Sequence, residues 1–107
     1  MRWCRVMKLI INELSFGDSI TYFFDEEKQL CFINEEQKSV DVIKTMQDLL
    51  NILCGAKTRM VNKQVLDGGR YDITILNGDK QRKYYFQNSY PKNFDKFIEI
   101  LGGLKKC

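Results

Sequence analysis

The segment that decides the fold class is residues 71–87, YDITILNGDKQRKYYFQ. Its two halves, 71–76 and 82–87, are rich in β-branched and aromatic residues, which is typical of strands. Between them stands Asn77-Gly78, a pair that strongly favours a tight hairpin turn, because both central residues of such a turn adopt positive φ. The segment therefore predicts an antiparallel hairpin.

More strands are expected before this hairpin. The segments 8–14, 19–24 and 29–34 have the same enrichment in β-branched and aromatic residues. A polar turn at 25–28 separates the second of them from the third. The stretch 57–65 fits either a short strand or a loop, so it leaves the number of strands open.

Two helices are expected, at 39–54 and 91–104, because apolar residues recur there at steps of three and four. Ser39 fits the N-cap of the first helix, and Pro91 fits the first turn of the second. Gly102-Gly103 fits the end of the second helix. The core positions that we expect from these stripes are Met46, Leu50, Phe97 and Leu101.

The expected fold is therefore α+β: an antiparallel sheet of about five strands with two helices packed on it, in the order βββα(β)ββα. A chain of 107 residues has the size of one domain, so we expect residues 1–107 to fold as a single unit. Met7 is a second candidate start, which leaves open a disordered extension at residues 1–6.

Charge is distributed unevenly along the chain, whose net charge is +3. Residues 1–53 carry six Lys or Arg against nine Asp or Glu, while residues 54–107 carry eleven against five. Such asymmetry can orient an acidic partner, although solvated surfaces also acquire it by chance. The apolar run near the N-terminus, 9–11, is too short for a signal peptide or a spanning helix. We therefore expect a cytoplasmic protein without membrane contact.

The cysteines do not form a metal-binding pattern. Four are present, at positions 4, 31, 54 and 107, without any C-x-x-C pair, and the sequence has no histidine. Zinc sites usually draw their ligands in closely spaced pairs. We expect free thiols, no metal and no cofactor.

Catalytic residues are not expected either. Without histidine, the commonest general base is missing. The clustered carboxylates, 25–27 and 35–36, lie in turn-like polar stretches, whereas general acids need burial to raise their pKa. The glycine pairs at 68–69 and 102–103 lack the spacing of a phosphate-binding loop. The sequence thus favours a binding protein over an enzyme.

The strand at 82–87 carries the candidate binding residues. Alternation places Lys83, Tyr85 and Gln87 on one face of the sheet and Arg82, Tyr84 and Phe86 on the other. Across the hairpin, Asp72 and Thr74 can share the first of these faces. The predicted partner-binding residues are Lys83, Tyr85, Gln87, Asp72 and Thr74. The alternative for Tyr85 is that it packs against a helix.

The C-terminal half resembles small bacterial inhibitor domains. The resemblance rests on residues 67–75, DGGRYDITI, on Asn77-Gly78, and on 91–94, PKNF, before an amphipathic end. One such group is the emfourin-like metalloprotease inhibitors, and another is the immunity proteins of contact-dependent or secreted toxin systems. The chain departs from the emfourin pattern at 15–17, where Ser-Phe-Gly stands instead of a Gly-Gly-Phe turn. No functional residue is carried over from either group.

The resemblance implies a protein that works by covering a partner. We therefore expect an immunity protein or inhibitor that neutralises a cognate toxin domain by protein–protein binding. Two other classes stay open: a small nucleic-acid-binding protein that uses the basic and aromatic strand, and a structural subunit of a larger assembly. The oligomeric state is also left open.

Overall fold

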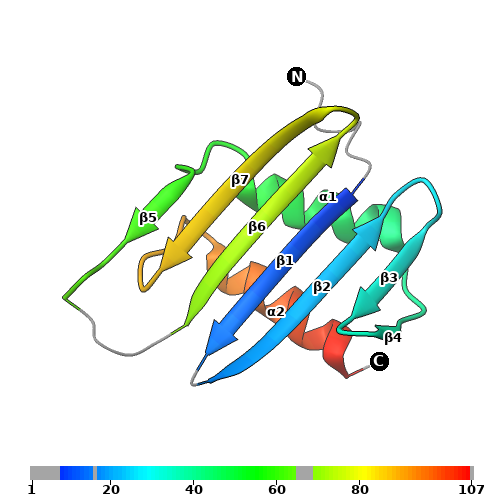
Figure 1. Cartoon of the computed structure of the whole chain (residues 1–107), viewed down its shortest axis with the longest axis horizontal. Coiled ribbons are helices and arrows are strands. Elements are labelled where there is room, and N and C mark those ends of the chain that lie inside the picture. Colours follow the sequence, from blue (N-terminus) through cyan, green and yellow to red (C-terminus); the bar gives the residue numbers. More distant parts are fainter. Residues whose placement is uncertain (1–7, 16, 65–68, 107) are drawn as a thin grey trace.

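A computed structural model describes residues 8–15, 17–64 and 69–106 of the chain. Within these ranges it contains two helices and seven strands in the order ββββαβββα (Figure 1). The strands are β1 (Lys8–Ser15), β2 (Asp18–Asp25), β3 (Leu30–Ile33), β4 (Glu36–Gln37), β5 (Arg59–Val61), β6 (Arg70–Asn77) and β7 (Lys80–Gln87). The helices are α1 (Val42–Leu53) and α2 (Phe94–Lys105).

All seven strands form one sheet, in the order β4-β3-β2-β1-β6-β7-β5. Neighbouring strands are antiparallel except for β5, which runs parallel to β7. The α+β class is thus confirmed, but the expected sheet of about five antiparallel strands is wrong, because the sheet has seven strands and is mixed. Strand β4 was not expected, whereas β5 lies in the stretch 57–65 that fitted either a strand or a loop. Both strands are short and pair with backbone groups at the two edges of the sheet, which would otherwise lack partners.

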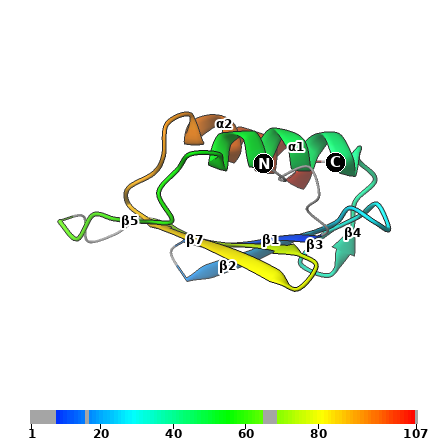
Figure 2. The ribbon, with the colours of Figure 1, turned by 90° about the horizontal axis from the view of Figure 1, so that it is seen from above.

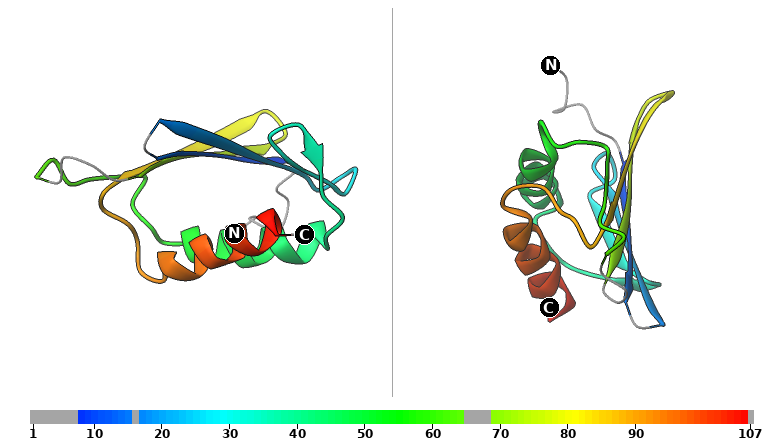
Figure 3. Two further views of the ribbon diagram at one scale, coloured as in Figure 1. Left: turned by 90° about the horizontal axis from the view of Figure 1, so that it is seen from below. Right: turned by 90° about the vertical axis from the view of Figure 1, so that its left-hand side faces the viewer.

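Both helices lie on the same face of the sheet, as the edge-on views show (Figures 2 and 3). The core lies between the helices and the sheet. Alternate side chains of five strands contribute to it: β1, β2, β3, β6 and β7. The four predicted core residues are all buried, with exposed fractions of 3% for Met46, 8% for Leu50, 0% for Phe97 and 1% for Leu101. Two amphipathic helices covering one sheet face are therefore what holds this domain together.

The helix ends differ from the expected ones. Helix α1 is capped by Asp41, whose carboxylate accepts a hydrogen bond from the backbone N of Lys44 at 3.2 Å, and not by Ser39. Pro91 lies three residues before α2, where its carbonyl accepts a hydrogen bond from the backbone N of Phe94 at 3.2 Å. Helix α2 continues through the predicted stop at 102–103, because its apolar stripe extends to Leu104, which is buried.

The β6–β7 hairpin forms as predicted, but its turn lies one residue later. Asn77 pairs with Lys80, so the two central residues are Gly78 and Asp79. Gly78 has a φ of +67°, and Asp79 is not among the residues with positive φ. A turn that needs positive φ only at its first central residue selects glycine at that position.

Some predictions fall outside the described residues, namely the extension at 1–6, Cys4 and Cys107. Of the two described cysteines, Cys31 is buried in the core and Cys54 is exposed at the end of α1. In the described part of the chain, no helix is long and apolar enough to cross a membrane.

Candidate functional site

The face of the sheet opposite the helices is left uncovered by the described elements (Figure 3). On β7, Tyr84 and Phe86 are buried, whereas Tyr85 is only partly buried. Alternation therefore directs Lys83, Tyr85 and Gln87 to the open face, as predicted. The alternative, in which Tyr85 packs against a helix, is wrong, because the core positions of this strand are taken by its two neighbours.

The register of the sheet brings open-face side chains from four strands into one row. Asn12 of β1 lies opposite Asp72 of β6, Asp72 lies opposite Tyr85 of β7, and Tyr85 lies opposite Arg59 of β5. Directly opposite residues on one face of a sheet are close enough for their side chains to interact. Residues from positions 12, 59, 72 and 85 thus meet although they are far apart in sequence.

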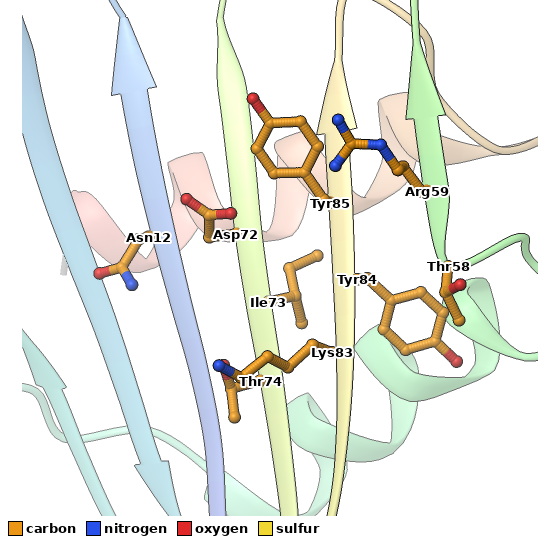
Figure 4. A pocket seen from close by; sticks show the side chains of 9 residues that line it. All are labelled: Asn12, Thr58, Arg59, Asp72, Ile73, Thr74, Lys83, Tyr84 and Tyr85. Carbon is orange, nitrogen blue, oxygen red and sulfur yellow. The ribbon is translucent and has the colours of Figure 1, made fainter.

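These residues line a shallow depression of about 470 Å³ on the open face (Figure 4). Four of the five predicted partner-binding residues line it: Asp72, Thr74, Lys83 and Tyr85. The remaining lining residues were not predicted: Asn12, Thr58, Arg59, Ile73 and Tyr84. The fifth predicted residue, Gln87, lies two positions beyond Tyr85 on the same face of β7. The structure therefore gathers the predicted residues at one place.

The central side chain of the depression, Tyr85, is held on two sides. Its hydroxyl donates a hydrogen bond to Oε1 of Gln87 at 2.9 Å. The guanidinium carbon of Arg59 lies 4.9 Å from the ring centroid, within the range of a cation–π contact. A half-buried ring fixed in this way has already lost much of its rotational freedom before any partner arrives.

Charge around the ring is predominantly positive. The exposed side chains of Arg59 and Lys83 supply two cations, and Asp72 supplies the one carboxylate of the lining. Guanidinium and ammonium groups donate hydrogen bonds to carboxylates and phosphates. Within the described residues, no group of three or more His, Cys, Asp or Glu side chains is placed to hold a metal ion. The depression is thus suited to receive an acidic group beside an aromatic ring.

A second aromatic site lies on the other half of the open face. Phe23 and Phe32 are directly opposite each other on β2 and β3, with ring centroids 6.4 Å apart, and both are partly exposed. Ile10 of β1 pairs with Phe23 on one side and with Thr74 on the other. A partly exposed apolar strip therefore leads from the aromatic pair to the rim of the depression.

The tyrosines with shifted pKa values belong to the covered face and not to this site. Tyr22 donates a hydrogen bond to Oε1 of Glu13 at 3.0 Å, and the side chain of Tyr71 is also hydrogen-bonded to Glu13. Burial, and then the charge of the Glu13 carboxylate, raise the pKa of both phenols above the usual range. Both hydroxyls therefore stay protonated and act as structural donors.

Sequence reasoning missed Arg59 and Asn12 for different reasons. Arg59 lies in the stretch 57–65 that fitted either a strand or a loop. Parallel strands are not joined by a tight turn, so no turn motif in the sequence indicates that β5 pairs with β7. Asn12 could have been assigned to the open face from the alternation with the buried Leu9 and Ile11. What the sequence did not indicate is that β1 pairs with β6 and so brings Asn12 next to Asp72.

No protein-family model matches this sequence, and a search of curated proteins found no significant relative. What the chain does must therefore be inferred from the chemistry of the open face. That face combines a fixed aromatic ring, two nearby cations and an apolar strip.

Proposed function

We propose that this chain is a small non-catalytic binding protein that neutralises a partner protein, a cognate toxin domain, in the cytoplasm. The observation that carries the proposal is Tyr85, a half-buried aromatic side chain held by Arg59 and Gln87 on a sheet face that the described elements leave uncovered. Immunity proteins and inhibitors act by covering a surface of their target, and this chain offers such a surface on a rigid element.

The composition of the open face supports a protein partner. Protein interfaces are enriched in tyrosine, phenylalanine and arginine, and their binding energy is concentrated in a few aromatic and arginine anchors. The open face carries Tyr85 with Arg59 at one place and the Phe23–Phe32 pair at another. Because these residues lie on strands of one sheet, their relative positions are fixed before binding, which lowers the entropic cost of the complex.

A nucleic-acid function is the second candidate, and Lys83 and Arg59 beside Tyr85 are the observation that favours it. Single-stranded nucleic acids bind to sheets through stacked aromatic rings and basic side chains. In this site, however, the guanidinium of Arg59 already lies against one face of the Tyr85 ring. A base would have to displace that contact in order to stack on this face of the ring, so at most one face of Tyr85 is left for stacking, and we favour a protein partner.

The direct test is co-expression with a toxin domain encoded beside this chain, followed by measurement of protection and of complex formation. Tyr85→Ala is expected to weaken the complex by about 1–4 kcal/mol, which is typical of a buried aromatic anchor. Lys83→Glu is expected mainly to slow association and to change its salt dependence, because an exposed charge acts through steering. The matched control is Lys96→Glu on α2, which changes the net charge equally on the helix side.

Two results would contradict the protein-binding function. One is equal loss of protection for Lys83→Glu and Lys96→Glu, which would indicate an effect of net charge alone. The other is an absence of complex together with tight, salt-dependent binding of single-stranded RNA or DNA that Tyr85→Ala abolishes. The second result would establish the nucleic-acid function in its place.

A further inference from the structure

Strand β7 has a partner along only part of its outer edge. It is eight residues long, but β5 pairs only with its last three, from Tyr85 to Gln87. Along 80–84, β6 lies on one side, and no described strand lies on the other. Figure 1 shows β5 beside one part of β7, and in Figure 4 the backbone turns away from β7 at Thr58. Among the residues that the structure describes, the first half of β7 is thus an open sheet edge.

The backbone of this open edge points its hydrogen-bonding groups outward. The backbone N of Tyr85 donates to the carbonyl of Thr58 at 2.8 Å, and the carbonyl of Gln87 accepts from the backbone N of Asn62 at 2.9 Å. Every second residue of a strand directs its N–H and C=O to the same side. Lys83 and Gln81 therefore direct theirs to the side from which β5 is absent. Two donors and two acceptors are placed there at strand spacing.

The side chains along this edge are basic and exposed. Residues 80–83 are Lys-Gln-Arg-Lys, and all four are exposed. Lys83 lies on the open face, while Lys80 and Arg82 belong to the helix side of the strand. An added strand would have cations along both of its faces, and Arg59 lies further along the same edge of β7. Charge complementarity selects an acidic segment.

The other occupants fit this edge less well. A second copy of the chain would bring its own basic segment 80–83 against this one, a like-charge arrangement that destabilises strand pairing and that proteins use to prevent edge association. A nucleic acid offers phosphate acceptors to the cations, but it has no regular row of donors for the outward carbonyls of the edge. An extended polypeptide supplies both donors and acceptors at the spacing required.

We infer that the edge of β7 at residues 80–83 binds an extended acidic segment of a partner protein, which adds to the sheet as a further strand. Thr58, Tyr84 and Lys83 line the depression at this point, so the added strand would end at the rim of the depression, where β5 begins to pair with Tyr85. The inference rests on the proposed protein-binding function and specifies the chemistry of the partner. It assigns main-chain recognition to the edge and side-chain recognition to the depression.

Proline at position 81 tests the main-chain part. The N–H of Gln81 points away from β6, so Gln81→Pro removes an outward donor without breaking a bond of the β6–β7 ladder. Gln81→Ala is the matched control, because it loses the same side chain but keeps the donor. The probe is a blocked hexapeptide of alternating Glu and Val, compared with its Lys-for-Glu counterpart and with a form N-methylated at alternate residues.

Amide NMR spectra of the protein during titration provide the readout. The acidic peptide is expected to shift the amides of Gln81 and Lys83 and to slow their hydrogen exchange, because both become hydrogen-bonded. Gln81→Pro and N-methylation are each expected to lower the affinity about tenfold or more, and Gln81→Ala less than about twofold. The lysine peptide is expected not to bind.

Three outcomes would overturn the inference: no saturable binding of the acidic peptide up to about 1 mM, equal affinity for the N-methylated form, or shifts that a single-stranded oligonucleotide produces more strongly at the same amides. Equal affinity for the N-methylated form would mean that the peptide binds through its charges and not through main-chain hydrogen bonds. If the toxin complex survives Gln81→Pro but is weakened by Tyr85→Ala, the edge inference fails while the proposed function stands. If neither variant affects the complex, both fail.

Discussion

Removal of the Glu13 carboxylate should destabilise the fold, because two buried hydroxyl groups depend on it. Glu13 lies on the helix side of β1 and is hydrogen-bonded to the phenols of Tyr22, at 3.0 Å, and Tyr71. The two tyrosines are 0% and 5% exposed. Their rings are packed in the core, so the two hydroxyls keep their positions when the carboxylate is lost.

The expected magnitude follows from the number of groups left without an acceptor. A buried polar group that loses its hydrogen-bond partner costs about 1–3 kcal/mol. For Glu13→Ala, two hydroxyls are affected, and the partial exposure of Glu13 lets water replace some of the lost bonding. We therefore expect a loss of about 2–4 kcal/mol. Glu13→Gln keeps one acceptor oxygen and should cost about 1 kcal/mol.

Urea denaturation at neutral pH measures these losses, and a double-mutant cycle assigns them to the cluster. In the background of Tyr22→Phe, Glu13→Ala should cost less stability, because only one of the two hydroxyls that lose their acceptor is then present. Additive effects of the two changes would refute the reasoning, as would a cost of Glu13→Ala below about 0.5 kcal/mol.

Phe97→Ala should lower the free energy of unfolding by about 3–5 kcal/mol, because Phe97 is fully buried and its ring stacks on that of Phe94, with the ring centroids 4.7 Å apart. The control is the neighbouring Ile98→Ala: this side chain is 43% exposed, and its loss should change the stability by less than about 1 kcal/mol. Chemical denaturation measures both variants. The free energy of unfolding should fall as the pH rises above about 10, by up to about 1.4 kcal/mol per pH unit for each buried tyrosine. The reason is that tyrosines in the unfolded chain lose their phenolic protons there, whereas Tyr22 and Tyr71 in the folded chain retain theirs because their pKa is raised. Urea midpoints between about pH 8 and pH 11 measure this slope, and a flat profile would contradict it. Gly102→Ala should raise the melting temperature, with a gain of roughly 0.5–1 kcal/mol, since Gly102 lies inside α2 and a Cβ there would meet nothing within 4 Å.

Local periodicity was sufficient to predict most elements and which side chains they bury. The steps of three and four in α1 and α2 depend only on residues one turn apart, and the four core positions that they predicted are buried. Alternation along β7 correctly separated Tyr84 and Phe86 from Lys83, Tyr85 and Gln87, because neighbouring strand residues must face opposite ways.

The pairing of distant strands was decided only by the tertiary structure. The sequence from 8 to 15 reads as a strand, but nothing local states that β1 is the centre of the sheet, with β2 on one side and β6 on the other. The pairing of β1 with β6, about 60 residues apart, depends on the packing of both helices and on the entropy of closing the intervening chain. Neither can be judged from a short segment of sequence. The same holds for β5, whose parallel pairing places Arg59 against Tyr85 and leaves the first half of β7 without a described strand on that side. Four of the nine residues that line the depression were therefore predicted from the sequence, whereas the other five, and the assembly of all nine at one place, depend on the fold.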